Sequence, residues 1–113
     1  MSPQIVIIES PFAGPTKAAR ARNLRYAQAC LLDSLKRGEA PYASHLLYTQ
    51  VLDDLVANER RQGMEAGFAF YRVASLSAVY TDLGISGGMR SGMERARAHG
   101  VTYELRAIPG WAA

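Results

Sequence analysis

The feature that most constrains the fold is a continuous apolar run near the start of the chain, Ile5-Val6-Ile7-Ile8, within residues 4–9. A strand with one face in water alternates apolar and polar residues, and this run does not alternate. Unbroken β-branched runs are typical of the central strands of parallel sheets, which helices cover on both faces. The run therefore predicts an α/β fold.

The rest of the chain divides by its apolar periodicity and its glycine and proline breaks. It predicts helices at 16–37, 45–52, 59–74 and 87–99, strands at 40–43, 76–81 and 101–108, and an irregular tail at 109–113. This order predicts a small three-layer, doubly wound α/β domain with about four parallel strands. One such domain accounts for residues 1–113, with the first and third strands in the middle of the sheet.

Several side chains have predicted places within these elements. The first long helix is expected to bury a stripe of Leu24, Ala27, Leu31 and Leu35, widened by Tyr26 and Cys30. The third helix is expected to face the core with Met64, Phe68, Tyr71 and Val73. Ser44 and Asn58 are expected to cap the second and third helices. Asn23 either is a solvated polar residue or reaches the loop after the first strand. Gly63 and Gly67, four residues apart, predict a close helix–helix contact, within the chain or between subunits.

Composition excludes several classes of protein. No apolar run approaches the length that spans a membrane, and no secretory signal is visible at the start. The lone Cys30 forms no internal disulfide, and with only two histidines the chain predicts no metal site and no cofactor. The net charge of +3 comes from bases interleaved with acids, which favours solvated helix faces over a nucleic-acid groove. We expect a cytoplasmic protein with no membrane and no nucleic-acid partner.

Two loops follow the predicted central strands. In open α/β sheets, ligands bind beyond the carboxyl ends of the strands. The second loop ends at Ser86, a predicted helix N-cap, and a helix start favours anions such as phosphate. The candidate ligand-binding residues are Ser10, Pro11, Phe12, Gly14, His45, Ser86, Gly87, Gly88 and Met89. For His45 the alternative is a partly exposed histidine at a helix start.

Two carboxylates end the predicted central strands, Glu9 in the first and Asp82 in the third. Together they could form an acid/base pair at the crevice between the two loops. The alternative interpretation is that each is a structural carboxylate at a strand end or turn. Both residues are the candidate catalytic groups.

These residues resemble a known group. The first strand with Ser10-Pro11-Phe12-Ala13-Gly14, the turn from Ser86 to Gly88 and the element order resemble the nucleoside 2-deoxyribosyltransferase superfamily, which includes deoxynucleoside monophosphate N-glycosidases. The segments 41–54 and 80–86 resemble a small uncharacterised family common in phages and prophages. This resemblance covers nearly the whole chain. The resemblance implies a nucleoside 2-deoxyribosyltransferase-like fold and a homo-oligomer, since relatives complete their sites across subunits.

The resemblance also implies a mechanism, in which a helix glutamate attacks C1′ of a deoxyribose and an aspartate assists departure of the base. The turn residues Ser86 and Gly88 match the superfamily pattern for holding a 5′-phosphate or 5′-hydroxyl. The nucleophile belongs four residues after Gly88, where this chain has Gly92. Glu94, two residues further on, points to another side of the helix.

Three functions remain open at this point. The chain could bind a nucleotide or nucleoside-like small molecule without the standard nucleophile. It could be an N-glycoside hydrolase or deoxyribosyltransferase that uses Asp82 or Glu9. It could instead be an interaction protein with a vestigial site, acting through the helix face of Gly63 and Gly67.

Overall fold

The structure, a computed structural model, describes residues 2–111. Met1, Ala112 and Ala113, at the ends of the predicted domain and its tail, lie outside the described residues. The elements follow the predicted order: β1 (Ile5–Glu9), α1 (Lys17–Lys36), β2 (Ala40–Tyr42), α2 (Ser44–Leu47), η1 (Tyr48–Gln50), α3 (Ala57–Ala69), η2 (Phe70–Arg72), β3 (Leu76–Tyr80), α4 (Gly87–Ala98) and β4 (Tyr103–Arg106).

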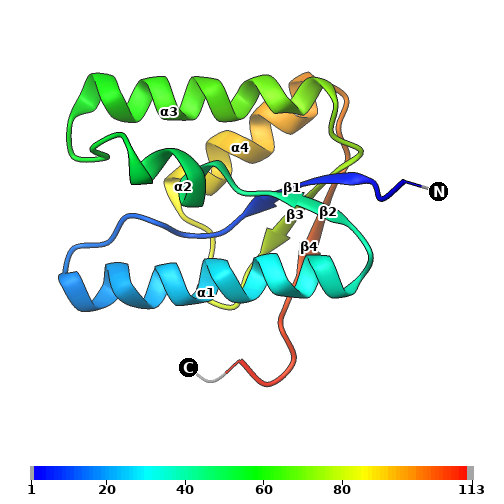
Figure 1. Ribbon diagram of the computed structural model, residues 1–113, viewed down its shortest axis with the longest axis horizontal. Coiled ribbons are helices and arrows are strands. Elements are labelled where there is room, and N and C mark those ends of the chain that lie inside the picture. Colours follow the sequence, from blue (N-terminus) through cyan, green and yellow to red (C-terminus); the bar gives the residue numbers. More distant parts are fainter. Residues whose placement is uncertain (1, 112–113) are drawn as a thin grey trace.

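The four strands form one parallel sheet in the order β2-β1-β3-β4. Helix α1 covers one face, and α3 and α4 cover the other, so the domain has three layers (Figure 1). The predicted doubly wound α/β architecture is confirmed, with β1 and β3 in the centre. Among residues 2–111, no helix combines the length and the apolarity needed to cross a bilayer.

Alternation along the central strands decides which layer each side chain meets. In β1, Val6 and Ile8 pack with α1, whereas Ile7 packs with Tyr71 on the opposite face. The register pairs Glu9 with Val79. Because successive side chains point to opposite faces, Glu9 shares the face of Ile7.

Helix α1 buries part of its predicted core face. Tyr26, Ala27 and Cys30 are buried and Leu31 packs against the core, as predicted, whereas Leu24 and Leu35 are 42% and 54% exposed. Two polar residues, Asn23 and Ser34, are buried as well. The buried polar side chains have partners: the Asn23 amide donates to the carbonyls of Phe12 and Ala13, at 3.2 and 3.1 Å, and the Ser34 hydroxyl donates to Glu39. Of the two alternatives for Asn23, the structure shows the contact with the first loop.

The predicted caps of two helices are wrong. Helix α3 begins at Ala57 with Val56 in the cap position, so Asn58 lies inside the helix. A tight turn replaces the side-chain cap, since the Asp53 carboxylate accepts from the backbone N–H of Leu55. Helix α2 begins at Ser44 itself, after Ala43.

Val73, which was predicted to face the core, lies in solvent: it follows η2 and is 58% exposed. In the edge strand β4, Leu105 is also 58% exposed. The buried side chain of β4 is instead Arg106. Its guanidinium forms two hydrogen bonds with the Glu39 carboxylate, at 2.8 and 2.7 Å, which satisfies the buried charge.

The aromatic residue of the tail packs on the body of the domain. Trp111 lies edge-on to Tyr26, with 4.9 Å between ring centroids. Residues 109–111 carry no regular secondary structure, as predicted.

Candidate functional site

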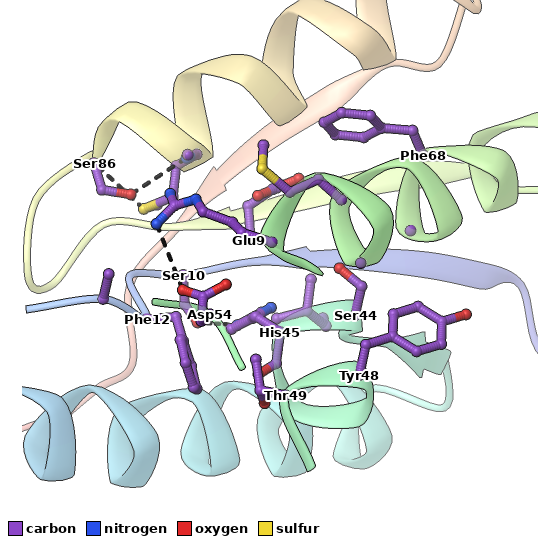
Figure 2. Close-up of a pocket in the computed structure, with 18 of the residues that line it drawn as sticks. Glu9, Ser10, Phe12, Ser44, His45, Tyr48, Thr49, Asp54, Phe68 and Ser86 are labelled. Atoms are coloured by element: carbon purple, nitrogen blue, oxygen red, sulfur yellow. Dashed lines mark hydrogen bonds and ion pairs between the residues drawn. The ribbon is translucent and has the colours of Figure 1, made fainter. Parts of the chain in front are cut away.

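A cavity of about 300 Å³ opens at the carboxyl end of β1, between α2, α3 and the start of α4. Figure 2 shows Ser86 on one side of it and Tyr48 on the other, with Glu9, Ser10 and His45 between them. Its size lies at the lower end of the range for small-molecule sites, roughly 300–1,000 Å³. The cavity therefore suits a small ligand.

The structure brings most of the predicted site residues together here. The cavity is lined by Glu9, Ser10, Phe12, His45, Ser86, Gly87, Gly88 and Met89. Pro11 and Gly14 instead line a separate groove on the α1 side of the two loops, which Ser86 also borders. The two predicted loops thus do lie next to each other, as expected from the strand order.

Asp82 does not reach the cavity. Its carboxylate accepts hydrogen bonds from the Tyr26 hydroxyl, at 2.6 Å, and from the backbone N–H of Ile108, at 2.9 Å. Tyr26 belongs to α1, so Asp82 faces the α1 layer. The hypothetical pair of Glu9 with Asp82 is therefore not formed, because the two carboxylates point to opposite faces of the sheet.

Glu9 is held in the cavity wall by one strong hydrogen bond. The Tyr71 hydroxyl, in η2 after α3, donates to Oε2 at 2.5 Å. Burial raises the pKa of the Glu9 carboxyl to about 7, and the Tyr71 hydrogen bond only partly opposes this shift. Among residues 2–111, no basic side chain forms an ion pair with Glu9. Glu9 can therefore both hold and release a proton near neutral pH.

Gly92 lies directly behind this carboxyl group. A Cβ atom added to Gly92 would come within 2.0 Å of Glu9 Oε2 and 2.6 Å of Glu9 Cδ. Real Cβ atoms do not approach other atoms so closely. The Glu9 carboxyl thus fills the space that a side chain at position 92 would enter.

His45 pairs with Ser10 on the floor of the cavity. The His45 Nε2 atom and the Ser10 hydroxyl are 2.7 Å apart. Burial lowers the pKa of His45 to about 4, so the imidazole is neutral at pH 7. Among the described residues no carboxylate bonds to His45, so the pair lacks the third group of a Ser-His-Asp arrangement. It serves better to hydrogen-bond a ligand than to activate a nucleophile.

The start of α4 provides an anion-binding end to the cavity. Ser86 is the N-cap, and its hydroxyl accepts from the backbone N–H of Met89 at 3.2 Å. The N–H groups of a first helical turn have no partner within the helix. Arg60 from α3 also lines the cavity, where it pairs with Asp54 at a long 3.5 Å. A cation and a helix start thus lie in one cavity.

Helix α3 contributes functional residues that the sequence analysis did not assign to the site. Arg60, Met64, Phe68 and Tyr71 all line the cavity. The last three were predicted to face the core, and Tyr71 is indeed buried. Their spacing was the available signal, but a stripe at helical spacing does not tell a cavity wall from a packed core.

The predicted glycine contact is made within the chain. A Cβ atom at Gly67 would lie 2.7 Å from both Cβ and Oγ of Ser44, the first residue of α2. At Gly63 it would lie 3.5 Å from Leu52. This helix face is therefore covered by α2 and the segment after it, and not by another subunit.

Among residues 2–111, no group of three or more histidine, cysteine, aspartate or glutamate side chains is placed to hold a metal ion. The polar groups of the cavity are carboxyl, hydroxyl, imidazole and guanidinium groups. Their chemistry is that of proton transfer, carboxylate attack and anion binding.

A comparison with curated proteins found no match. Residues 4–106 match a family described as a domain of unknown function, DUF7768. The match includes every strand, every helix and all the residues of the cavity described above. The chain therefore belongs to the DUF7768 family.

Proposed function

We propose that the chain binds a nucleoside or nucleotide-like small molecule in the cavity at the end of β1. The observation that carries the proposal is the combination, in one cavity, of a helix start, a basic side chain and an aromatic wall. The start of α4 and Arg60 suit a phosphate or a 5′-hydroxyl. Phe12 and Phe68 offer flat apolar surface to a base.

The resemblance to the nucleoside 2-deoxyribosyltransferase superfamily supports the same ligand class. It rests on the Ser86 turn, the loop from Ser10 to Gly14 and the topology. The shared topology alone would not be sufficient, since one fold hosts many functions. The cavity adds hydroxyl and imidazole groups, from Ser10 and His45, that suit the polar edge of a sugar or base.

Thermal unfolding with a ligand panel tests this proposal. A ligand that binds only the folded state stabilises it, by about 2.7 kcal/mol at 100 times the Kd. We expect a rise in Tm with at least one deoxynucleoside or deoxynucleoside 5′-monophosphate. If no member of the panel raises Tm or gives a heat of binding in calorimetry, the proposal fails.

Two neighbouring arginines provide a matched pair of variants. Arg60→Ala is expected to weaken binding of 5′-monophosphates about tenfold, while nucleosides without phosphate keep their affinity. Arg61→Ala, on the exposed side of α3 and outside the cavity, removes the same charge and should leave both affinities unchanged. Equal effects of the two changes would contradict a phosphate contact at Arg60.

The proposal includes a cytoplasmic homo-oligomer. Beside the cavity, the segment between α2 and α3 exposes three apolar side chains, Leu47, Val51 and Leu55, and Val51 and Leu55 are 80% and 87% exposed. Exposed apolar groups of this kind are typical of association surfaces. Sedimentation equilibrium of the wild type against a Val51→Asp, Leu55→Asp variant tests this: a monomeric wild type contradicts it.

A further inference from the structure

Two residues far apart in the sequence share one small volume in the cavity wall. The Glu9 carboxyl ends β1, and Gly92 lies buried in the second turn of α4. A Cβ atom at Gly92 would lie 2.0, 2.6 and 2.9 Å from Oε2, Cδ and Oε1 of Glu9. While the carboxyl group keeps this position, a side chain at position 92 has no room, and any side chain there would displace it from its hydrogen bond with Tyr71.

The surroundings of Glu9 are unfavourable for a purely structural carboxylate. Its one side-chain partner among the described residues is the Tyr71 hydroxyl, and it has no ion pair. Burying a carboxyl group with a single donor opposes folding, because most of its hydration is not replaced. By comparison, Asp33, Asp54 and Glu39 each pair with an arginine, and Asp82 accepts hydrogen bonds from two donors, the Tyr26 hydroxyl and the backbone N–H of Ile108. A costly acid that faces a ligand cavity is a candidate catalytic group.

We propose that Glu9 is the catalytic carboxylate of an N-glycoside hydrolase, acting from β1 in the place that Gly92 leaves empty on α4. This inference rests on the proposed function, because the substrate is the bound nucleoside or its 5′-monophosphate. Glu9 attacks the anomeric carbon C1′ of the sugar. Tyr71 positions the carboxyl group and keeps it directed at the cavity.

The reaction balances in two steps. In the first, a bond forms between Glu9 Oε and C1′ while the C1′–N bond breaks; the electron pair leaves with the base nitrogen, which takes a proton from water and leaves hydroxide. In the second, a water molecule attacks C1′, the ester bond breaks, and its electron pair returns to the Glu9 carboxylate. The proton lost by this water neutralises the hydroxide. The sum is one nucleoside and one water converted into free sugar and free base.

The test measures binding and base release on the same samples of the full chain. Deoxynucleosides and their 5′-monophosphates are each incubated with the wild type, Glu9→Gln and Asp82→Asn, with free base followed by chromatography and affinity by calorimetry. We expect Glu9→Gln to keep its affinity within about threefold and to release base on the order of 10⁶-fold more slowly, as when other nucleophiles are removed. Asp82 lies outside the cavity, so the Asp82→Asn variant should release base at the wild-type rate.

The outcomes separate the inference from the proposed function. Binding without release by the wild type, for every member of the panel, overturns the inference and leaves the proposed function standing. No binding of any member overturns the proposed function. Release by Glu9→Gln at the wild-type rate overturns the role of Glu9 even though the chain is an enzyme.

Two further measurements keep the inference testable if Glu9→Gln does not fold. A 2′-fluoro-substituted nucleoside slows breakdown of the ester, so mass spectrometry should find the sugar on the peptide that contains Glu9; release of base with no such adduct overturns covalent attack. In the double variant Glu9→Ala, Gly92→Glu, the carboxyl group returns to α4. If the double variant releases base faster than Glu9→Ala alone, the result supports the inference that positions 9 and 92 share one volume. Base release no faster than that of Glu9→Ala contradicts it.

Discussion

Two acidic residues on opposite faces of the sheet, Glu39 and Glu9, have opposite surroundings. On the α1 face, Arg106 holds Glu39 with two hydrogen bonds and also bonds Glu104 and Tyr80, while Tyr80 donates to Asp33. On the α3 and α4 face, Glu9 has one hydroxyl partner and no cation. The pKa values follow: hydrogen bonds from Arg106 lower that of Glu39, and burial raises that of Glu9.

This difference separates stability from chemistry within one small domain. The α1 face carries paired charges, in which Arg106 of β4 holds Glu39, a residue that lies between α1 and β2. The opposite face leaves a buried acid unneutralised beside a cavity. Sites that do chemistry often carry such unfavourable groups, and the rest of the fold compensates for them.

The largest expected effect comes from removing an ion pair on the α1 face of the sheet. Arg106→Met should lower the free energy of unfolding by about 3–5 kcal/mol, because it leaves Glu39 buried without its partner. Arg37→Ala removes a bridge to Asp33 from an arginine that is 43% exposed, and should cost below about 1 kcal/mol. Urea unfolding measures both, and similar losses would show that burial adds nothing to the Arg106 pair.

The next effect concerns the close contact between Gly92 and the Glu9 carboxyl group on the α3 and α4 face. Gly92→Ala should lower the free energy of unfolding by about 3 kcal/mol, since the new methyl group collides with the Glu9 carboxyl. The same change in a Glu9→Ala background should cost much less, so the double-mutant cycle gives a large coupling. Additive costs would show that the carboxyl group readily moves away from Gly92. Gly87→Ala, which meets no atom within 4 Å, is the control.

Glu9 itself should make stability depend on pH. Its folded pKa of about 7 lies above the ordinary value of 4.5, so ionisation disfavours the folded state. The penalty is absent below pH 4.5, grows between pH 4.5 and 7, and is complete above pH 7. Glu9→Gln should therefore match the wild type at pH 4 and exceed its stability by about 3 kcal/mol at pH 8, since one pKa unit corresponds to about 1.4 kcal/mol. A difference in Tm that is constant from pH 4 to 8 would contradict a buried, titrating carboxyl group.

The ion pairs on the α1 face should make stability depend on pH in the opposite direction from Glu9, and this effect should be the smallest. The pKa values of Glu39 and Asp33 are lowered in the folded protein, by hydrogen bonds from Arg106 and from Tyr80 and Arg37 respectively, which outweigh burial. Their contribution is present above the ordinary carboxyl pKa and is lost as pH falls below it. Arg106→Met should flatten the fall in Tm below pH 4.5, by about 1 kcal/mol in free energy. If Tm falls equally steeply below pH 4.5 in the wild type and in Arg106→Met, the pairing of these carboxylates with Arg106 does not contribute to the pH dependence of stability.

The topology was predictable because its signals are local. The apolar run Ile5-Val6-Ile7-Ile8 and the largely apolar Leu76–Tyr80 indicate strands covered on both faces, and the order of elements then restricts the sheet. The separation of Glu9 from Asp82 was not predictable in the same way. Alternation assigns the two carboxylates to opposite faces only once the register of β1 against β3 is known, and the folded structure provides that register.

The buried face of α1 and the contact between Glu9 and Gly92 could not be predicted, because they depend on partners distant in the sequence. The buried face of α1 carries Asn23 and Ser34 because loop carbonyls and Glu39 satisfy them, and no helical periodicity reveals such partners. The glycine at position 92 and the acid at position 9 were both noted, but 83 residues separate them. Only the folded chain shows that they occupy one volume.

The close approach of Glu9 to Gly92 has a consequence for the evolution of this family. If the two positions compete for one space, an acid at one excludes a side chain at the other. Related chains should then fall into two groups, those with an acid at position 9 and glycine at 92, and those with a small residue at 9 and an acid at 92. A chain that lacks the helix acid would be a rearranged catalyst and not a degenerate one, and surveys that judge activity from a single aligned column would misclassify it.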